Sequence, residues 1–187
     1  MVRSAPAQAR STTVIMLTTP RAGYEHRVVP ISGLLVCDNP KVTLGSHSVG
    51  MGLVVAAYDP VAHVGGMYHA MLPEAVANPA RARERPGMFV DVGFDTLNLT
   101  LRGLGAVTSR LVYFAAGGAQ VMGACGSLNI GLRNTQTLRR LLADSAVTLV
   151  GENLGGHTCR SFYLGIESGE ASVLLSGQLN EISLCLR

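Results

Sequence analysis

The sequence predicts an α+β fold in which β-sheets pack together and helices cover one side. Three observations lead to this prediction: short apolar runs bounded by turn residues, two segments whose apolar residues recur at helical spacing, and a hairpin signature late in the chain. We assign a single domain to residues 26–187, because a chain of this length can bury a core of its own. Residues 1–25 are small, polar and punctuated by proline, so we expect a flexible lead-in there.

Strands dominate the prediction for the first part of this domain. Apolar runs or alternation between turn residues predict strands over residues 28–37, 53–57 and 64–72. A glycine-punctuated approach over residues 44–52 leads into the second of these strands, and we expect its backbone to be flexible. Residues 74–87 contain prolines and charged residues, and we expect them to form a loop.

Two helices are predicted from the spacing of apolar residues. In residues 91–104 these side chains recur at intervals of three and four, and the pattern stops at Gly103 and Gly105, as a helix end should. A second helix is predicted to begin at Asn134, because asparagine is a favourable N-cap. The residues that follow place leucines on one face and arginines on the other.

The remaining strands lie between and after the two helices. Residues 110–116 form an apolar run that ends in glycines, and residues 147–150 form a shorter one. Residues 161–166 and 171–175 flank a turn-like sequence at residues 167–170, which is typical of a β-hairpin.

Composition argues against several classes of protein. Charged residues make up 14% of the chain and the formal net charge is +3, an excess too small to indicate nucleic-acid binding. No apolar run approaches the roughly 20 residues of a membrane span, so we expect a cytoplasmic protein without membrane insertion. The four cysteines lack the spacing of a metal site and no phosphate-binding glycine motif is present, so we expect no metal and no cofactor.

Three arginines, Arg81, Arg83 and Arg85, gather between Pro79 and Pro86. A cluster of this kind is more often a solvated loop than a binding surface. The alternative interpretation is a docking surface for an acidic partner.

His69 is the main candidate for chemistry. It lies in a short apolar strand, where Met67 and Met71 share its face. A histidine in this setting is either a satisfied core residue or a general base. Ser46 and Ser48 lie in the glycine-punctuated approach, where the favoured interpretation is a serine that hydrogen-bonds the turn.

Two sequence motifs stand out: GGMYHAMLP at residues 65–73 and IGLRN at residues 130–134. Further short blocks accompany them in a fixed order over roughly residues 28–175. Together these blocks resemble the chemoreceptor glutamine deamidase family, CheD. The resemblance implies an α/β/β sandwich, with two packed β-sheets and helices on one side.

The same resemblance implies a chemistry and a set of partners. Members of the family convert particular glutamines of methyl-accepting chemotaxis receptors to glutamates, and they bind CheC-type phosphatases. They use a cysteine nucleophile, a histidine base and a hydroxyl residue that helps to order the site. The histidine of the family corresponds to His69 and the hydroxyl residue to Ser46. The cysteine, seventeen residues before the histidine, corresponds to Gly52.

Gly52 is therefore a departure from the family pattern, because glycine offers no nucleophile. Removing such a group costs on the order of a millionfold in turnover. Our leading hypothesis is a CheD-type protein that binds a chemoreceptor, a CheC-like phosphatase or both, with deamidation lost or strongly impaired. The alternative is an active glutamine deamidase in which Ser46, Ser48 or Cys159 serves as a substitute nucleophile and His69 acts as the base.

Overall fold

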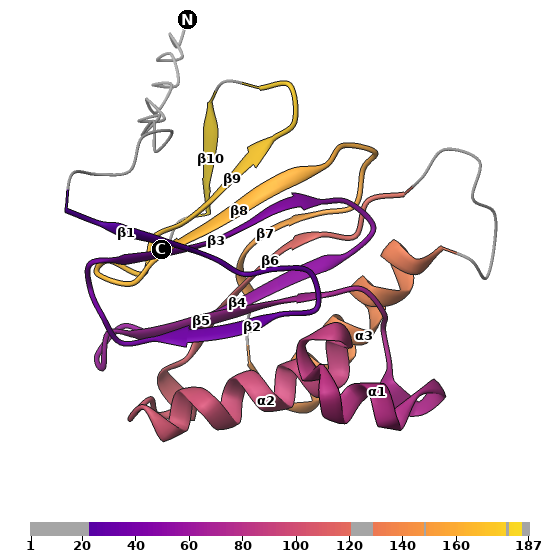
Figure 1. Ribbon diagram of the computed structural model, residues 1–187, viewed down its shortest axis with the longest axis horizontal. Helices are drawn as coiled ribbons and strands as arrows, with labels where there is room; N and C mark the ends of the chain where they lie inside the picture. The colour runs from indigo at the N-terminus through magenta and orange to yellow at the C-terminus, as the bar shows by residue number, and fades with distance from the viewer. Residues whose placement is uncertain (1–22, 121–128, 148, 179, 185–187) are drawn as a thin grey trace, which may run out of the picture.

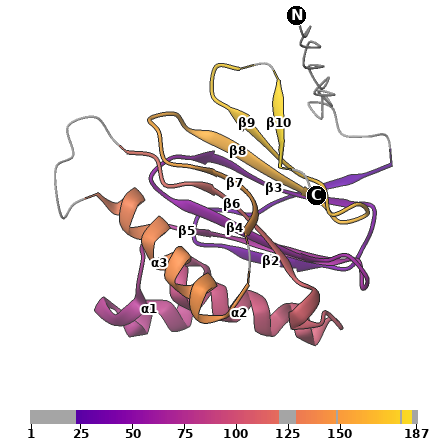
Figure 2. The same ribbon diagram turned by 180° about the vertical axis from the view of Figure 1, so that it is seen from behind.

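The computed structural model describes residues 23–120, 129–147, 149–178 and 180–184. Most of the expected lead-in, residues 1–22, therefore lies outside the described residues. Within them, two five-stranded sheets pack face to face, and three α-helices cover the outer side of one sheet (Figures 1 and 2). This arrangement confirms the predicted α+β sandwich.

The outer sheet has the strand order β1-β3-β8-β9-β10, and no helix of the described residues lies over it in either view. Its strands are β1 (Glu25–Val28), β3 (Val42–Val49), β8 (Arg160–Gly165), β9 (Ala171–Leu175) and β10 (Glu181–Leu184). Strands β1 and β3 run parallel, and the other neighbours are antiparallel. Strand β3 is therefore fixed on both sides, by β1 and by β8.

The inner sheet lies between the outer sheet and the helices and has the strand order β2-β5-β4-β6-β7. Its strands are β2 (Leu34–Cys37), β4 (Leu53–Asp59), β5 (Val64–Ala70), β6 (Val112–Gly117) and β7 (Leu149–Leu154). Every residue of β4 and β5 is buried. Both faces of these strands are covered, which is why their sequences read as continuous apolar runs rather than as alternation.

In the described part of the chain, three α-helices cover the inner sheet, and three short 3₁₀ turns accompany them (Figure 2). They are α1 (Pro79–Glu84), α2 (Val90–Gly103), α3 (Ile130–Asp144), η1 (Ala75–Ala77), η2 (Pro86–Met88) and η3 (Thr108–Arg110). Helix α2 buries Phe94, Leu97 and Leu101 against the inner sheet, and α3 buries Leu138 and Leu142. None of the helices in the described ranges has the length and apolar character that crossing a membrane requires.

The two faces of β5 enter two different hydrophobic clusters. Met67 belongs to the cluster between the sheets, and Tyr68 belongs to the cluster between the inner sheet and the helices. Because side chains alternate along a strand, His69 points in the same direction as Met67, into the space between the two sheets. The register of β5 thus places this histidine opposite the outer sheet.

The structure corrects two strand predictions. Residues 28–37 are not one strand, because β1 ends at Val28 and a turn containing Ser32, with φ 64°, separates it from β2. Residues 44–52 are not a flexible approach, because β3 continues to Val49. Gly45 is needed in this strand for space, since a Cβ there would collide with the ring of His26.

Two helix predictions also need correction. The expected loop at residues 74–87 contains α1, which Asn78 caps by accepting a hydrogen bond from the Arg81 amide, with Pro79 in the first turn. Helix α3 starts four residues before the predicted N-cap at Asn134: the cap is Asn129, whose side chain accepts from the Leu132 amide at 3.0 Å. Helix α2 begins and ends within one residue of its predicted bounds.

A buried carboxylate holds one end of the inner sheet. Asp59, at the end of β4, accepts hydrogen bonds from the backbone amides of Val61, Ala62 and Val107 and forms a 2.8 Å ion pair with Arg110. Burial alone raises the pKa of the Asp59 carboxyl, but the Arg110 guanidinium and the three amides together lower it well below its usual value. The carboxylate therefore stays ionised in the folded chain at neutral pH.

We expect Asp59→Asn to lower the free energy of unfolding by about 2–4 kcal/mol near pH 7, since it leaves a partly buried guanidinium without its partner. A carboxyl with a depressed pKa stabilises the fold above its unfolded pKa of about 4 and loses that effect as the pH falls further. The difference in the free energy of unfolding between wild type and variant should therefore become smaller below about pH 4. Urea unfolding at several pH values measures it, with the exposed Asp38→Asn as control. A difference independent of pH would contradict this account.

Candidate functional site

The two sheets meet at a buried pair of polar side chains. His69, near the end of β5, places its Nδ1 2.9 Å from the Oγ of Ser46 in the middle of β3. His69 is 3% exposed and Ser46 is fully buried. The structure thus brings together two candidate residues, His69 and Ser46, from strands that lie in different sheets.

The hydrogen bonds of Ser46 determine which nitrogen of His69 carries the proton. The Ser46 hydroxyl lies 3.1 Å from the carbonyl oxygen of Val29, which can only accept, so the hydroxyl donates to it. The same oxygen must then accept from Nδ1–H of His69. This tautomer leaves Nε2 with a free lone pair.

Burial also sets the charge of the imidazole. Desolvation lowers the pKa of His69 from its usual value of 6.5 to about 4. The ring is therefore neutral near pH 7, with Nε2 able to accept a proton or a hydrogen bond.

Gly52 lies directly in front of this nitrogen. A Cβ added at Gly52 would stand 2.8 Å from Nε2 of His69 and 2.9 Å from the carbonyl oxygen of Ala70. The φ of Gly52 is outside the left-handed region, so the backbone there is compatible with a side chain. The ring, however, already lies in the space that a side chain would need, and any larger residue has to displace it.

Asn134 joins the two segments that carry Gly52 and His69. Its Nδ2 donates to the carbonyl oxygen of Met51 at 3.1 Å and to that of Met71 at 3.3 Å. The side chain is fully buried, and no described donor reaches its Oδ1. Asn134 was predicted as a helix cap, but its actual position four residues before Leu138 puts it on the buried face of α3, a signal already present in the helical spacing.

Backbone hydrogen bonds fix the segment around Gly52. The carbonyl oxygen of Gly52 accepts from the Gly118 amide at 2.7 Å, and that of Gly50 accepts from the Ala119 amide at 2.9 Å. The carbonyl of Gly117, in turn, accepts from the Gly155 amide at 2.8 Å. The end of β6 therefore connects the segment before β4 to the loop after β7.

A buried arginine holds that loop in place. The guanidinium of Arg160 donates to the carbonyl oxygens of Asn153, Gly155 and Thr158. Arg160 itself is 3% exposed, and its side chain fills the interior of the loop. Backbone hydrogen bonds and Arg160 thus hold three chain segments together around position 52.

The other candidate residues lie apart from the imidazole. Ser48 is exposed, with φ 54°, and no hydrogen bond joins it to His69 in the described residues. Cys159 is exposed as well, and its Sγ would be 3.3 Å from a Cβ added at Gly50. No hydrogen bond links its thiol to His69 within the described ranges, and Cys125 lies outside them.

The arrangement combines a neutral base with a neighbouring residue that has no side chain. Nε2 of His69 can accept a hydrogen bond from an amide or a water, but Gly52 supplies no group for it to activate. Met51, next to Gly52 in the chain, and Met71, two residues after His69, are each 42% exposed. In the described part of the chain, His, Cys, Asp and Glu side chains do not gather in groups of three that could hold a metal ion.

We expect His69 to make folding depend on pH. Its folded pKa of about 4 lies below the unfolded value of about 6.5, so the unfolded chain binds more protons between these values. The free energy of unfolding should therefore fall as the pH is lowered from about 6.5 to about 4, by up to about 3 kcal/mol. His69→Gln should remove this part of the pH dependence in urea unfolding, whereas the exposed His157→Gln should retain it. Equal pH dependence in both variants would contradict the assignment.

We expect Asn134→Ala to loosen both segments that flank the imidazole. The variant loses two buried hydrogen bonds, which should lower the free energy of unfolding by about 1–3 kcal/mol. Amide hydrogen exchange should accelerate at residues 51–54 and 69–71. Gln136→Ala, at an exposed position of the same helix, is the matched control. Unchanged exchange at these residues would mean that Asn134 does not hold them.

Comparison with known proteins identifies the chain's relatives. The family model described as "CheD chemotactic sensory transduction" matches residues 71–174. The probable chemoreceptor glutamine deamidase CheD of Solibacter usitatus is 37% identical over 158 residues, which are 84% of this chain and 94% of the relative. The chemoreceptor glutamine deamidase CheD of Thermotoga maritima is 36% identical over 149 residues, which are 79% of this chain and 90% of the relative.

These matches differ in the part of the chain that they cover. The family model begins two residues after His69, so it does not include Ser46, Gly52 or His69 itself. The alignments with the two relatives span about four fifths of this chain and nearly all of each relative. The family model also covers more than half of the chain. The chain therefore belongs to the CheD family of chemotaxis proteins.

Proposed function

We propose that this protein is a CheD-type chemotaxis protein that acts by binding, with glutamine deamidation lost or strongly impaired. Its proposed partners are the cytoplasmic domain of a chemoreceptor, a CheC-like phosphatase or both. The observation that carries the proposal is that Nε2 of His69 faces a glycine: a Cβ at Gly52 would be 2.8 Å from this nitrogen. The names of the relatives supply the substrate class, chemoreceptor glutamine.

The missing chemistry follows from how a cysteine deamidates glutamine. The imidazole takes the thiol proton, and the thiolate attacks the carboxamide carbon. Ammonia leaves with a proton from the imidazolium, and water hydrolyses the thioester to give glutamate and the free thiol. With glycine at position 52, His69 can only assist direct attack of water on the amide. We expect turnover on the order of a millionfold below that of a cysteine enzyme.

The neutral imidazole is nevertheless suited to recognising a glutamine. The pKa of His69, near 4, keeps Nε2 unprotonated, so it can accept a hydrogen bond from the carboxamide NH₂. Met51 and Met71 are close to Gly52 and His69 in the chain, and their exposed side chains offer apolar surface to the rest of the substrate. These features support retained binding without hydrolysis.

The alternative function is an active deamidase with a substitute nucleophile. Cys159 is the candidate that an observation favours, because its exposed thiol lies beside Gly50, two residues from Gly52. Ser46 is less suited to attack, because its hydroxyl is fully buried and already donates to Val29. A Cys159 mechanism would require the loop after β7 to move toward the imidazole.

Mass spectrometry of a chemoreceptor cytoplasmic fragment distinguishes the two functions. The fragment should bind the wild-type protein, and its glutamines should remain unconverted after incubation. Glutamate formation that disappears in both His69→Ala and Cys159→Ser would establish the alternative. Failure of the fragment and of a CheC-like phosphatase to bind would overturn the proposed function itself.

Restoring a thiol provides the complementary test. Gly52→Cys should convert glutamine to glutamate at a measurable rate, and the double variant with His69→Ala should not. Gly52→Ala is the matched control, because it has the same Cβ and no nucleophile. Both substitutions should lower the free energy of unfolding by about 1–3 kcal/mol, since the Cβ displaces the imidazole or the Ala70 carbonyl. A folded Gly52→Cys variant without activity would show that more than the nucleophile is missing.

A further inference from the structure

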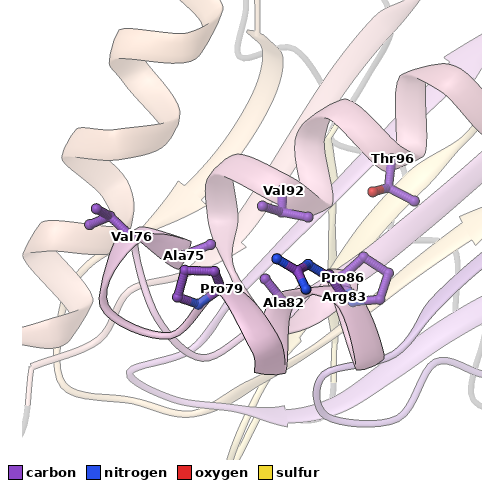
Figure 3. Close-up of a pocket in the computed structure, with 8 residues that line it drawn as sticks. All are labelled: Ala75, Val76, Pro79, Ala82, Arg83, Pro86, Val92 and Thr96. Atoms are coloured by element: carbon purple, nitrogen blue, oxygen red, sulfur yellow. The ribbon is translucent and has the colours of Figure 1, made fainter.

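A groove opens in the helical layer, between α2 on one side and η1, α1 and η2 on the other (Figure 3). Its volume is about 640 Å³, within the range typical of ligand-binding pockets. The side chains around it are small or apolar except for one arginine and one threonine: Ala75, Val76, Pro79, Ala82, Arg83, Pro86, Val92 and Thr96. None of these residues belongs to the site around His69.

Exposed apolar side chains extend the groove at both ends. Val76, in η1, is 80% exposed at one edge. Leu99, on α2 and three residues after Thr96, is 64% exposed, and it follows Val92 along the same face of the helix. A mostly apolar groove with exposed apolar residues beyond it is typical of a surface that another chain covers.

The groove also carries an uncompensated positive charge. Residues 79–88 contain three arginines and one glutamate, a net charge of +2. Arg81 pairs with Glu84 at 3.7 Å, but no described carboxylate lies within ion-pair distance of Arg83. Figure 3 shows the guanidinium of Arg83 turned toward the middle of the groove, beneath Val92. A carboxylate from outside could therefore reach it.

The walls of the groove are fixed before any partner binds. The carboxylate of Asp91 accepts from the Ala75 amide at 3.0 Å and ties η1 to the start of α2. The Met88 carbonyl accepts from the Met71 amide at 2.9 Å, which connects η2 to the segment after His69. Because the groove is preformed, a partner loses little free energy in ordering it.

We propose that this groove is a second docking surface for the chemoreceptor, which seats an acidic amphipathic helix of its cytoplasmic domain. The inference rests on the proposed receptor-binding function. A helix fits because the groove lies between helices and offers apolar contacts along its length, the geometry in which residues at spacings of three and four insert as anchors. A glutamate or aspartate beside these anchors pairs with Arg83. Docking here would engage the segment that follows the candidate site in the chain, since η1 begins at Ala75, five residues after β5 ends at Ala70.

Two groove variants and two matched controls test the proposal. Arg83→Glu reverses the charge inside the groove, and Val76→Asp puts a charge on its apolar edge. Lys41→Glu makes the same change in net charge in the turn before β3, and Val61→Asp alters a comparably exposed valine, 65% exposed, in the turn between β4 and β5. All four side chains are exposed, so thermal unfolding should change little.

The measurement is the affinity of a labelled chemoreceptor cytoplasmic fragment, followed by fluorescence anisotropy. We expect Arg83→Glu and Val76→Asp each to weaken binding by about tenfold or more, and both controls to stay within about twofold of wild type. If both groove variants bind the fragment as tightly as the wild type does, the groove is not a docking surface, and the proposed function is unaffected. Equal weakening by the controls would also overturn the groove proposal, since the effect would then be one of net charge. A fragment that does not bind the wild-type protein would overturn the groove proposal together with receptor binding, and it would leave phosphatase binding as the remaining part of the proposed function.

Discussion

The hydrogen bond between Ser46 and His69 is the contact on which the site depends. It links the outer sheet to the inner sheet in a fully buried position, and the Val29 carbonyl gives it a direction. The direction fixes the tautomer, and burial keeps the ring neutral. Neither property belongs to a histidine on its own: both follow from the way the two sheets pack.

The helical layer supports the backbone next to the site. Asn134, on α3, donates hydrogen bonds to the backbone carbonyls of Met51 and Met71. The helical layer thus holds the segments just before β4 and just after β5 of the inner sheet. The backbone bonds from Gly118 and Ala119 complete this support. All three layers therefore converge on a few residues, which explains why a small buried pair can keep one geometry.

Physical patterns in the sequence predicted some of these features and missed others. Helix α2 was predicted almost to its ends, because its apolar spacing and terminal glycines both reflect local structure. Strand β3 was missed, because its glycines resemble turn signals when the neighbouring His26 ring that requires one of them is unknown. The residues of the site were selected by resemblance, but the partners of Ser46 and Asn134 are distant in the chain, and no local pattern encodes such contacts.

The crowding in front of Gly52 has an evolutionary implication. A residue with a side chain at this position could be exchanged for glycine without disturbing the segments around it, since backbone atoms hold the segment. The reverse exchange places a Cβ less than 3 Å from the imidazole of His69 and from the carbonyl oxygen of Ala70, so one of these groups has to shift. The change to glycine therefore leaves the local structure in place, whereas the reverse change lowers the stability of the fold unless neighbouring residues change as well.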